Sequence, residues 1–379
     1  MRVGILTLPL YCNYGGIMQC YALQTVLQRM GHDTIILRRE YNRKYSFHGA
    51  CIYYTKHLIK LLIGRRSSWH YHVSQERRDY IAQNTYKFID KHISPRSERC
   101  FSTKDLKKEV IKNRLDAIIV GSDQVWRPYY SPCLTNYFLD FLEGDQKIKK
   151  IGYGASFGSD EWSFTHQQTI VCRGLLKSFN AVSVRETSAI KLCKEHLGVD
   201  AIQVLDPTML LDKEDYIKII TSNKKEGGGL FCYVLDRSQE KKKIINFITN
   251  TTQLTSFESM PKLEEDVYNL YGEIEKCVYP PVEDWISAFH EADMIMTDSF
   301  HGTVFSIIFN KPFWVVGNEG RGMARFKSIL SLFGLEGRLI TNSSLSYIDI
   351  HEAIDWNKVN KRRNELIHIS MDFLQHTIN

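Results

Sequence analysis

Short apolar runs alternate with helical stretches through most of the chain, and this alternation constrains its fold more than any other feature. The run "RVGILTL" is followed by a stretch in which Cys20, Leu23, Leu27 and Met30 share one helical face, and then by a second run, "DTIIL". Further expected strands lie at 116–120, 149–158, 181–184, 201–211, 229–236, 293–297 and 312–317. Strands separated by helices pair in parallel, so the pattern predicts an α/β fold with helices on both faces of mainly parallel sheets.

A change of composition near residue 212 divides this pattern into two series. The stretch "DKEDYIKIITSNKKEGGG" is charged and then rich in glycine, which is typical of a junction between domains. A chain of 379 residues also exceeds the usual size of one domain. We therefore expect two Rossmann-like, doubly wound domains, residues 1–212 and 213–350, that face each other across a cleft. Residues 351–379 are expected to form a C-terminal helix, and its return to the first domain stays open.

The composition is that of an ordinary globular protein, with 43% hydrophobic and 24% charged residues. Its nine cysteines include no C-x-x-C pair, and the first residues lack the pattern of a secretory signal. We therefore expect reduced thiols and a cytoplasmic location. No apolar run approaches the roughly 18 residues of a transmembrane helix, so the sequence predicts none.

A basic, aromatic-rich segment, residues 38–78, stands out against the mild net charge of +6. It contains ten Lys or Arg and two Asp or Glu, together with several Tyr, Trp and His residues. We interpret it in the first place as a solvated helix and loop. The alternative is peripheral contact with the anionic inner face of a membrane, or with a substrate that carries phosphate. Nucleic acid is not expected as a partner, because no recognition motif accompanies the charge.

The first turn of the chain, "NYGGIMQCYALQ", is a candidate anion site. Asn13, Gly15 and Gly16 stand between the first strand and the first helix, at the carboxyl edge where doubly wound sheets bind ligands. Glycine allows close approach to the backbone, and the N–H groups and dipole of a helix start favour negative charge. The alternative is that the two glycines only form a tight turn.

A second turn of the same kind, "TDSFHGTVFSIIFNKPF", carries the sharpest local signal. A strand ends at Thr297, and Ser299 or Asp298 can cap the helix that follows. His301 and Gly302 fall in the first turn of that helix. From there the imidazole would project into the cleft, to donate to a phosphate or to shuttle a proton. The alternative is a histidine that packs against a neighbour.

Three arginines are candidates for binding an anion. Arg185 directly follows the apolar run "AVSV", so it lies at the carboxyl end of a strand, where a guanidinium suits a carboxylate or phosphate. Arg321 and Arg325, in "GNEGRGMARFKSIL", are four residues apart and share one face if a helix has begun. The alternatives are an ion pair of Arg185 with Glu186, and surface positions for the other two.

The turn "GSDQVWRP" suits a sugar. It places Ser122, Asp123 and Gln124 directly after a strand, with Trp126 close by. A carboxylate accepts hydroxyl protons, and an indole ring offers an apolar face on which a sugar can stack. The alternative is a capping aspartate and a tryptophan in the core.

Other motifs argue against other chemistries. The stretch "GASFG", residues 154–158, matches G-x-S-x-G, but a loop rather than a helix is expected after Ser156, which argues against a nucleophile elbow. We interpret "DPTMLL" as a structural Asp-Pro turn. The chain has no P-loop motif and no H-E-x-x-H, and its late acidic residues are spaced as on a solvated helix face, so no metal site is expected.

Taken in order, these stretches resemble the polysaccharide pyruvyl transferase family. The resemblance is carried by "NYGGIMQCYALQ", "GSDQVW", "YGASFG", "SVRE", "DPTMLL", "DSFHGTVFSIIFNKPF" and "RGMARF", and it spans about residues 2–335. It implies a GT-B-like fold and an enzyme of capsule or exopolysaccharide synthesis. It further implies transfer of a pyruvyl group from phosphoenolpyruvate to two sugar hydroxyls, which forms a ketal and releases phosphate without a cofactor or metal. The acceptor would be a sugar or a lipid-linked oligosaccharide.

The resemblance also implies roles for the candidate residues. His301 would bind the phosphate or act as general acid, and Arg185 would hold the carboxylate or phosphate of the donor. Asp123 would orient or deprotonate a sugar hydroxyl. Arg321 and Arg325 would be further contacts for an anion.

One departure from the family pattern bears on the donor. Well-studied members have a Ser-x-Arg-x-His pattern, and Ser299 stands here in place of its arginine. Two other functions therefore stay open. One is a GT-B-like glycosyltransferase that uses a nucleotide sugar, and the other is a non-catalytic protein that binds a sugar or phosphate.

Overall fold

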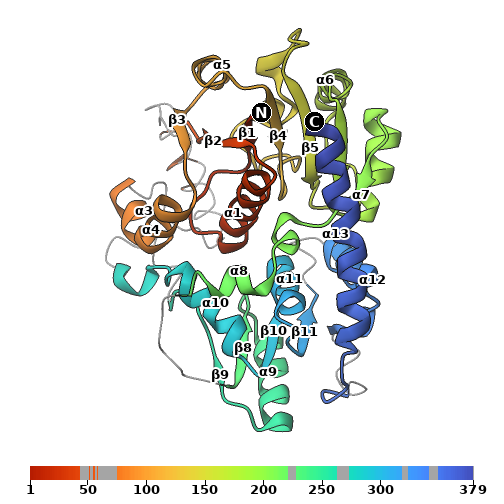
Figure 1. Ribbon diagram of the computed structural model, residues 1–379. Helices are drawn as coiled ribbons and strands as arrows, with labels where there is room; N and C mark the ends of the chain where they lie inside the picture. The colour runs from red at the N-terminus through yellow and green to blue at the C-terminus, as the bar shows by residue number, and fades with distance from the viewer. Residues whose placement is uncertain are drawn as a thin grey trace.

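Two parallel sheets, one above the other in Figure 1, form the framework of the protein. The computed structural model describes residues 1–42, 75–220, 228–262, 273–317, 323–340 and 349–378, together with Cys51, Tyr54, Thr55 and Leu58. The strand order is β3-β2-β1-β4-β5-β6-β7 in the first sheet and β12-β11-β10-β8-β9 in the second. All strand pairs among the described residues are parallel, which confirms the fold class expected from the alternation of strands and helices.

The first sheet and its helices come from the first half of the chain. In order, these elements are β1 (Arg2–Leu6), α1 (Tyr14–Arg29), β2 (Asp33–Arg39), α3 (Gln75–Ile81), α4 (Gln83–His92), β3 (Arg96–Cys100), α5 (Thr103–Lys112), β4 (Ala117–Val120), β5 (Lys149–Ala155), α6 (His166–Leu176), β6 (Ala181–Val184), α7 (Thr187–Leu192) and β7 (Ile202–Gln203).

The second sheet and its helices come from the second half. These elements are α8 (Lys213–Ile217), β8 (Leu230–Tyr233), α9 (Gln239–Thr252), β9 (Ser256–Phe257), α10 (Val282–Glu291), β10 (Met294–Thr297), α11 (Phe300–Ile308), β11 (Phe313–Val316), α12 (Met323–Phe333), β12 (Leu339–Ile340) and α13 (Trp356–Ile378). The change of composition near residue 212 lies between β7 and β8, at the N-terminus of α8.

Position in the sheet explains which strands are apolar. β1 lies between β2 and β4, and Val3, Ile5 and Leu6 are fully buried. A parallel strand that is covered on both faces needs such a continuous apolar run. The edge strand β3 reads "RSERC" and alternates between buried and exposed residues. It pairs with β2 through Arg38 opposite Arg99.

The two halves share one hydrophobic core where α1 meets α10. The ring of Tyr14, at the start of α1, stacks on Trp285 of α10 with ring centroids 5.4 Å apart. The Tyr14 hydroxyl donates to the carbonyl of Pro280 at 2.8 Å. Both rings are almost completely buried, and fully burying a side chain of this kind contributes about 2–3 kcal/mol. This contact holds the first turn of α1 against the second half of the chain.

The last helix, α13, runs alongside both halves in Figure 1, and its end lies beside β5. The ammonium group of Lys149 in β5 donates to the carbonyl of Ile378 at 2.8 Å. The hydroxyl of Ser370 accepts from the backbone N–H of Leu205 at 2.9 Å. The last helix therefore returns to the first half and contacts both halves of the chain.

One expected strand is shorter than the sequence indicated, and one expected segment lies mostly outside the described residues. The strand expected at 201–211 is only Ile202–Gln203, because the chain turns at Asp206 into a short 3-10 helix, Pro207–Leu210. Of the basic segment 38–78, most residues lie outside those that the structure describes. In the described part of the chain, no helix is both long and apolar enough to cross a bilayer.

Candidate active site

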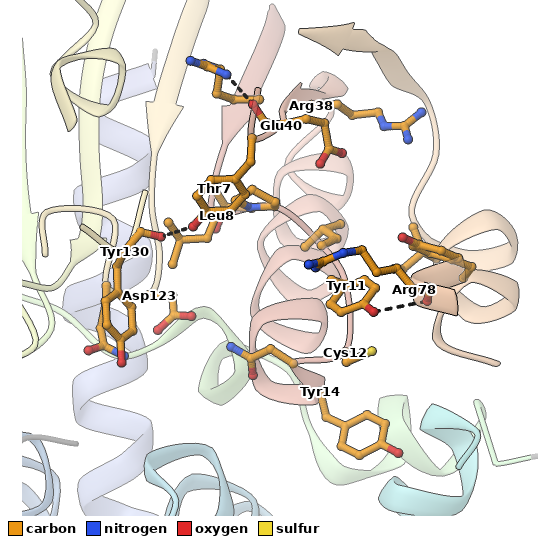
Figure 2. A pocket seen from close by; sticks show the side chains of 18 of the residues that line it. Thr7, Leu8, Tyr11, Cys12, Tyr14, Arg38, Glu40, Arg78, Asp123 and Tyr130 are labelled. Carbon is orange, nitrogen blue, oxygen red and sulfur yellow. Dashed lines mark hydrogen bonds between the residues drawn. The ribbon is translucent and has the colours of Figure 1, made fainter. Parts of the chain in front are cut away.

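A cleft of about 1760 Å³ lies between the two halves, at the carboxyl ends of their strands. The segments that follow β1, β2, β4, β8 and β10 all contribute to its lining. Figure 2 shows the labelled side chains of Asp123 and Tyr130 on one side of α1 and that of Arg78 on the other. The site therefore forms where parallel α/β sheets ordinarily bind ligands.

Gly15 at the start of α1 makes room for a histidine from the other half of the chain. A Cβ atom at position 15 would lie 2.1 Å from Nδ1 of His301, so no other residue fits there without a shift. The helix is capped by Asn13, whose side-chain oxygen accepts from the N–H of Gly16 at 3.1 Å. The close approach that the glycine turn permits is therefore the approach of His301.

His301 lies in the first turn of α11, at the floor of the cleft. Ser299 caps this helix, because its hydroxyl accepts from the N–H of Gly302 at 3.3 Å. A Cβ atom at Gly302 would lie 2.1 Å from Oγ1 of Thr297, so the glycine allows the helix to start directly at the strand end. His301 and Ser299 both line the cleft, and each is 6% exposed.

Asp206 is the partner of His301, and sequence analysis assigned it only a structural turn. Its Oδ2 atom lies 3.5 Å from Nε2 of His301 and accepts from the Arg185 guanidinium at 2.8 Å and from the Ser122 hydroxyl at 3.2 Å. Its Oδ1 atom accepts from the N–H and hydroxyl of Thr208. The only signal in the sequence was an acidic residue before a proline at the end of an expected strand.

Asp206 is ionised in this setting. Burial alone would raise the pKa of its carboxyl group, but the charges of His301 and Arg185, together with the hydrogen bond from Arg185, outweigh burial and hold the pKa well below its ordinary value. A buried carboxylate beside an imidazole orients the ring and stabilises its protonated form. Asp206 therefore holds a negative charge directly beside the imidazole that lines the cleft.

Arg185 lies behind the cleft wall rather than in it, which corrects the expectation of direct contact with the donor. Its side chain is 2% exposed and faces three carboxylates: Asp206 at 2.8 Å, Glu186 at 3.2 Å and Asp123 at 3.6 Å. Its guanidinium also lies 4.1 Å from the ring centre of Phe300. Burial opposes its charge, but these carboxylates outweigh burial and raise its pKa. A buried charge requires such partners, and here they leave no face toward the cleft.

The turn after β4 divides into cleft and core residues. Asp123 and Gln124 line the cleft, and Asp123 has a positive φ of 71°, a conformation that aspartate tolerates better than most residues. Ser122 is fully buried, and its N–H donates to the Gln19 side chain at 2.9 Å.

Trp126 is not the aromatic platform that the motif suggested. It is fully buried, stacks on Phe138 and donates from Nε1 to the carbonyl of Tyr137 at 3.0 Å. Because the indole is largely apolar, it packs in the hydrophobic core of the first half. The aromatic residue that lines the cleft in this region is Tyr130, which is 40% exposed and lies under the guanidinium of Arg127.

Arg325 of α12 is the second arginine near His301. It lines the cleft, and burial together with the neighbouring charge of Arg185 lowers its pKa to about 10. It therefore keeps its positive charge at neutral pH. The companion candidate, Arg321, lies outside the described residues.

Ser156 has no nucleophile geometry. It is fully buried, its hydroxyl accepts from the N–H of Gly158 at 3.0 Å, and the next helix begins ten residues later, at His166. Within the described ranges, no group of three or more His, Cys, Asp or Glu side chains could hold a metal ion.

The likeness to one solved structure indicates the fold. UGT89C1 of Arabidopsis thaliana, solved with UDP-L-rhamnose, is 10% identical, has a TM-score of 0.50, and covers 98% of each chain. MurG of Acinetobacter baumannii is 11% identical with a TM-score of 0.49, and 99% of each chain is covered. UDP-GlcNAc 2-epimerase of Methanocaldococcus jannaschii is 12% identical with a TM-score of 0.46, over 97% of this chain and 93% of that one. The likeness to UGT89C1 concerns the fold alone, which is GT-B-like.

Sequence comparison identifies the family. A search of curated proteins found no match. The family model for polysaccharide pyruvyl transferase matches residues 13–320, a span that begins at the cap of α1 and includes β10 and α11. This span covers most of the chain and contains Asn13, Asp206 and His301. The chain therefore belongs to the polysaccharide pyruvyl transferase family.

Proposed function

We propose that this protein transfers the pyruvyl group of phosphoenolpyruvate to two hydroxyls of one sugar in a surface-polysaccharide precursor. The family supports a transferase of this kind. The observation that carries the proposal is the pairing of His301, which lines the cleft from the second half of the chain, with Asp206, which is buried in the first half. Asp123 and Arg325 line the same cleft.

The proposed reaction balances without a cofactor or metal. A proton adds to the methylene carbon of phosphoenolpyruvate, which leaves C2 as an oxocarbenium-like centre. One sugar hydroxyl forms a bond to C2 and loses its proton. The C2–O bond to phosphate then breaks, and phosphate leaves with the electron pair and a proton. A second hydroxyl of the same sugar bonds to C2 and loses its proton, which closes the ketal.

His301 is our candidate for the general acid. The ionised carboxylate of Asp206 stabilises the imidazolium and sets the orientation of the ring. Around this pair the carboxylates of Asp123, Asp206 and Glu186 are matched by the guanidinium groups of Arg127, Arg185 and Arg325.

Arg325 is our candidate to replace the family arginine that is absent at Ser299. Its guanidinium reaches the cleft from α12, and it keeps its charge. Together with the N-terminus of α11 it offers positive charge where the phosphate would develop charge on leaving. Asp123 is our candidate to orient or deprotonate the sugar hydroxyl, and Arg185 acts behind it as a positioning residue.

The acceptor and its location are part of the proposal. A sugar or a lipid-linked oligosaccharide of a capsule or exopolysaccharide precursor would enter along the side of the cleft that carries Tyr130. Residues 38–78 are basic and rich in aromatic side chains, and on this ground we propose that they contact a membrane surface. Sedimentation with vesicles that contain phosphatidylglycerol tests that contact.

The test is acceptor-dependent release of phosphate from phosphoenolpyruvate, with the ketal methyl group detected by proton NMR. We expect both signals with the wild-type protein, and we expect neither with His301→Ala. His166→Ala is the matched control, because His166 is exposed on α6 and does not line the cleft. It should leave both signals unchanged.

Thermal unfolding with added ligands separates this proposal from its alternatives. A ligand at about 100 times its dissociation constant stabilises a protein by about 2.7 kcal/mol. Stabilisation by phosphoenolpyruvate is expected. Stabilisation by UDP or GDP, with none by phosphoenolpyruvate, would instead favour a glycosyltransferase that uses a nucleotide sugar.

A further inference from the structure

Three arginines line the cleft on the opposite side of α1 from Asp123. Arg38 lies at the end of β2, and Arg96 and Arg99 lie in β3. We call these three residues the arginine cluster. Figure 2 shows Arg38 near the end of its strand, well separated from the labelled Asp123 and Tyr130.

The arginine cluster brings like charges together. Arg38 and Arg99 are direct partners in the register of β2 and β3, and like charges at such positions destabilise a sheet. Partial burial, followed by the charges of Arg96 and Arg99, lowers the pKa of Arg38. A protein retains such an arrangement most readily where a ligand of opposite charge relieves it.

Acidic neighbours compensate the arginine cluster only in part. Asp90 forms an ion pair with Arg96. The charges of Glu40 and Asp90 raise the pKa of Arg38 and so partly offset the neighbouring arginines. Asp105, in the first turn of α5, also lines the cleft, and its carboxylate accepts from the backbone N–H of Phe101. Within the described ranges, no ion pair engages the side chain of Arg38 or Arg99.

The two ends of the cleft therefore differ in charge. Around His301, the carboxylates of Asp123, Asp206 and Glu186 are matched by the guanidinium groups of Arg127, Arg185 and Arg325. Arg39 and Arg78 line the cleft too, so with the arginine cluster five guanidinium groups stand against the carboxylates of Glu40, Asp90 and Asp105. The volume of about 1760 Å³ also exceeds the roughly 300–1,000 Å³ of a site for one small ligand, so a second group can bind beside the donor.

We propose that the arginine cluster binds a phosphate or diphosphate group that the sugar acceptor carries. The description of this ligand as the acceptor rests on the proposed function, but the anion site itself does not. Guanidinium groups bind phosphate oxygens in pairs, and Arg38 and Arg99 are Cα partners on neighbouring strands whose charges act on each other. The acceptor would then be held by its anionic end at β2 and β3, while its sugar extends along the cleft toward His301.

Isothermal titration calorimetry of the full-length protein tests this site with two probes, inorganic pyrophosphate and glucose 1-phosphate, and with glucose as the uncharged comparison. We expect both anions to bind and glucose to bind far more weakly. The variant Arg38→Gln with Arg99→Gln should bind both anions at least about tenfold more weakly, because a charged hydrogen bond is lost at each position. Lys242→Gln with Lys243→Gln on α9 is the matched control, because both lysines are exposed and lie outside the cleft lining.

The thermal stability of the double arginine variant separates ligand binding from loss of folding. Because the two arginines repel each other, the variant should unfold at the same or a higher temperature than the wild type. Pyrophosphate binding that is equal in the wild type and the arginine variant would overturn the proposal, and so would absence of binding to the wild type.

Two further arms assign the source of the phosphate and separate this proposal from the proposed function. If the arginine variant loses sedimentation with phosphatidylglycerol vesicles but binds pyrophosphate normally, the arginine cluster contacts a membrane and the proposal is wrong. If pyrophosphate binding behaves as expected but no phosphate is released from phosphoenolpyruvate, the anion site stands and the proposed function fails.

Discussion

The imidazole of His301 fills the space next to the α-carbon of Gly15, so that a Cβ atom there would lie 2.1 Å from Nδ1. These two residues are far apart in the sequence and belong to the two halves of the chain. Their contact fixes the position of the imidazole relative to the first sheet. It also gives a physical reason for glycine in the turn before α1.

Gly15→Ala should therefore displace His301 and destabilise the protein. Overpacking of this kind costs about 1–3 kcal/mol, and we expect acceptor-dependent phosphate release to fall with it. Urea unfolding measures the first effect. Gly174→Ala in α6 is the control, because nothing lies within 4 Å of its Cβ position, and alanine inside a helix should stabilise the protein by about 0.5–1 kcal/mol. A Gly15→Ala variant with wild-type stability and activity would show that the contact is not needed.

Asp206→Asn should lower stability at neutral pH, because it removes the carboxylate that Arg185 and His301 share. Breaking a buried ion pair costs about 3–5 kcal/mol, which the remaining contacts of Arg185 with Glu186 and Asp123 would reduce. The variant isolates the contribution of one carboxylate to the folded state.

The pH dependence of unfolding gives a second test at Asp206. The pKa of its carboxyl group is depressed in the folded state, so the stability it contributes is present above the unfolded value of about 3.9 and is lost as the pH falls toward the folded value. Wild-type stability should therefore decline from about pH 5 downward more steeply than that of Asp206→Asn. Parallel curves for the two proteins, measured by urea unfolding between pH 7 and pH 3, would contradict this assignment.

Trp126→Phe should lower stability without a specific effect on the acceptor. It shortens a fully buried side chain and removes the hydrogen bond to the carbonyl of Tyr137, which together cost about 1–3 kcal/mol. Tyr130→Ala, in contrast, should raise the KM for the acceptor with little change in unfolding, because Tyr130 is 40% exposed in the cleft. A raised acceptor KM in Trp126→Phe, with an unchanged KM in Tyr130→Ala, would show that Trp126 is the aromatic platform after all.

Arg325→Gln should weaken binding of phosphoenolpyruvate by at least about tenfold, since a charged hydrogen bond contributes about 1.5–3 kcal/mol. Its guanidinium lies at the cleft and keeps its charge. Titration calorimetry with phosphoenolpyruvate measures the change. Arg362→Gln is the control, because Arg362 lies outside the cleft lining on α13 and pairs with Glu365 at the surface. Equal affinity in Arg325→Gln and the wild type would remove Arg325 from the donor site.

The sequence predicted the framework well where burial dictates the residue pattern. β1, β4, β8, β10 and β11 are buried parallel strands, and each was visible as an apolar run. The strand β3 was not predicted, because its sequence "RSERC" is polar and it forms the edge of the sheet. The two-residue strands β9 and β12 were also not predicted, because they are too short to carry a periodic signal.

Several residues of the candidate site were predicted from the sequence, but the contacts between them were not. Asn13, His301 and Asp123 line the cleft, as their places after strands indicated. Arg185 and Trp126 also follow strands, but whether a side chain at a strand end faces the cleft or the core depends on its neighbours. Asp206 was interpreted as a structural turn, because its contact with Arg185 arises only when β6 and β7 pair, and its contact with His301 arises only when the two halves meet.

The most direct test of the account is a double-mutant cycle between His301 and Asp206 in the kcat/KM for acceptor-dependent phosphate release. If the two side chains act as one proton-delivering unit, His301→Ala with Asp206→Asn should lose no more activity than His301→Ala alone. If instead the losses of the two single variants multiply in the double variant, the residues act independently, and the convergence of the two halves on one catalytic pair is contradicted.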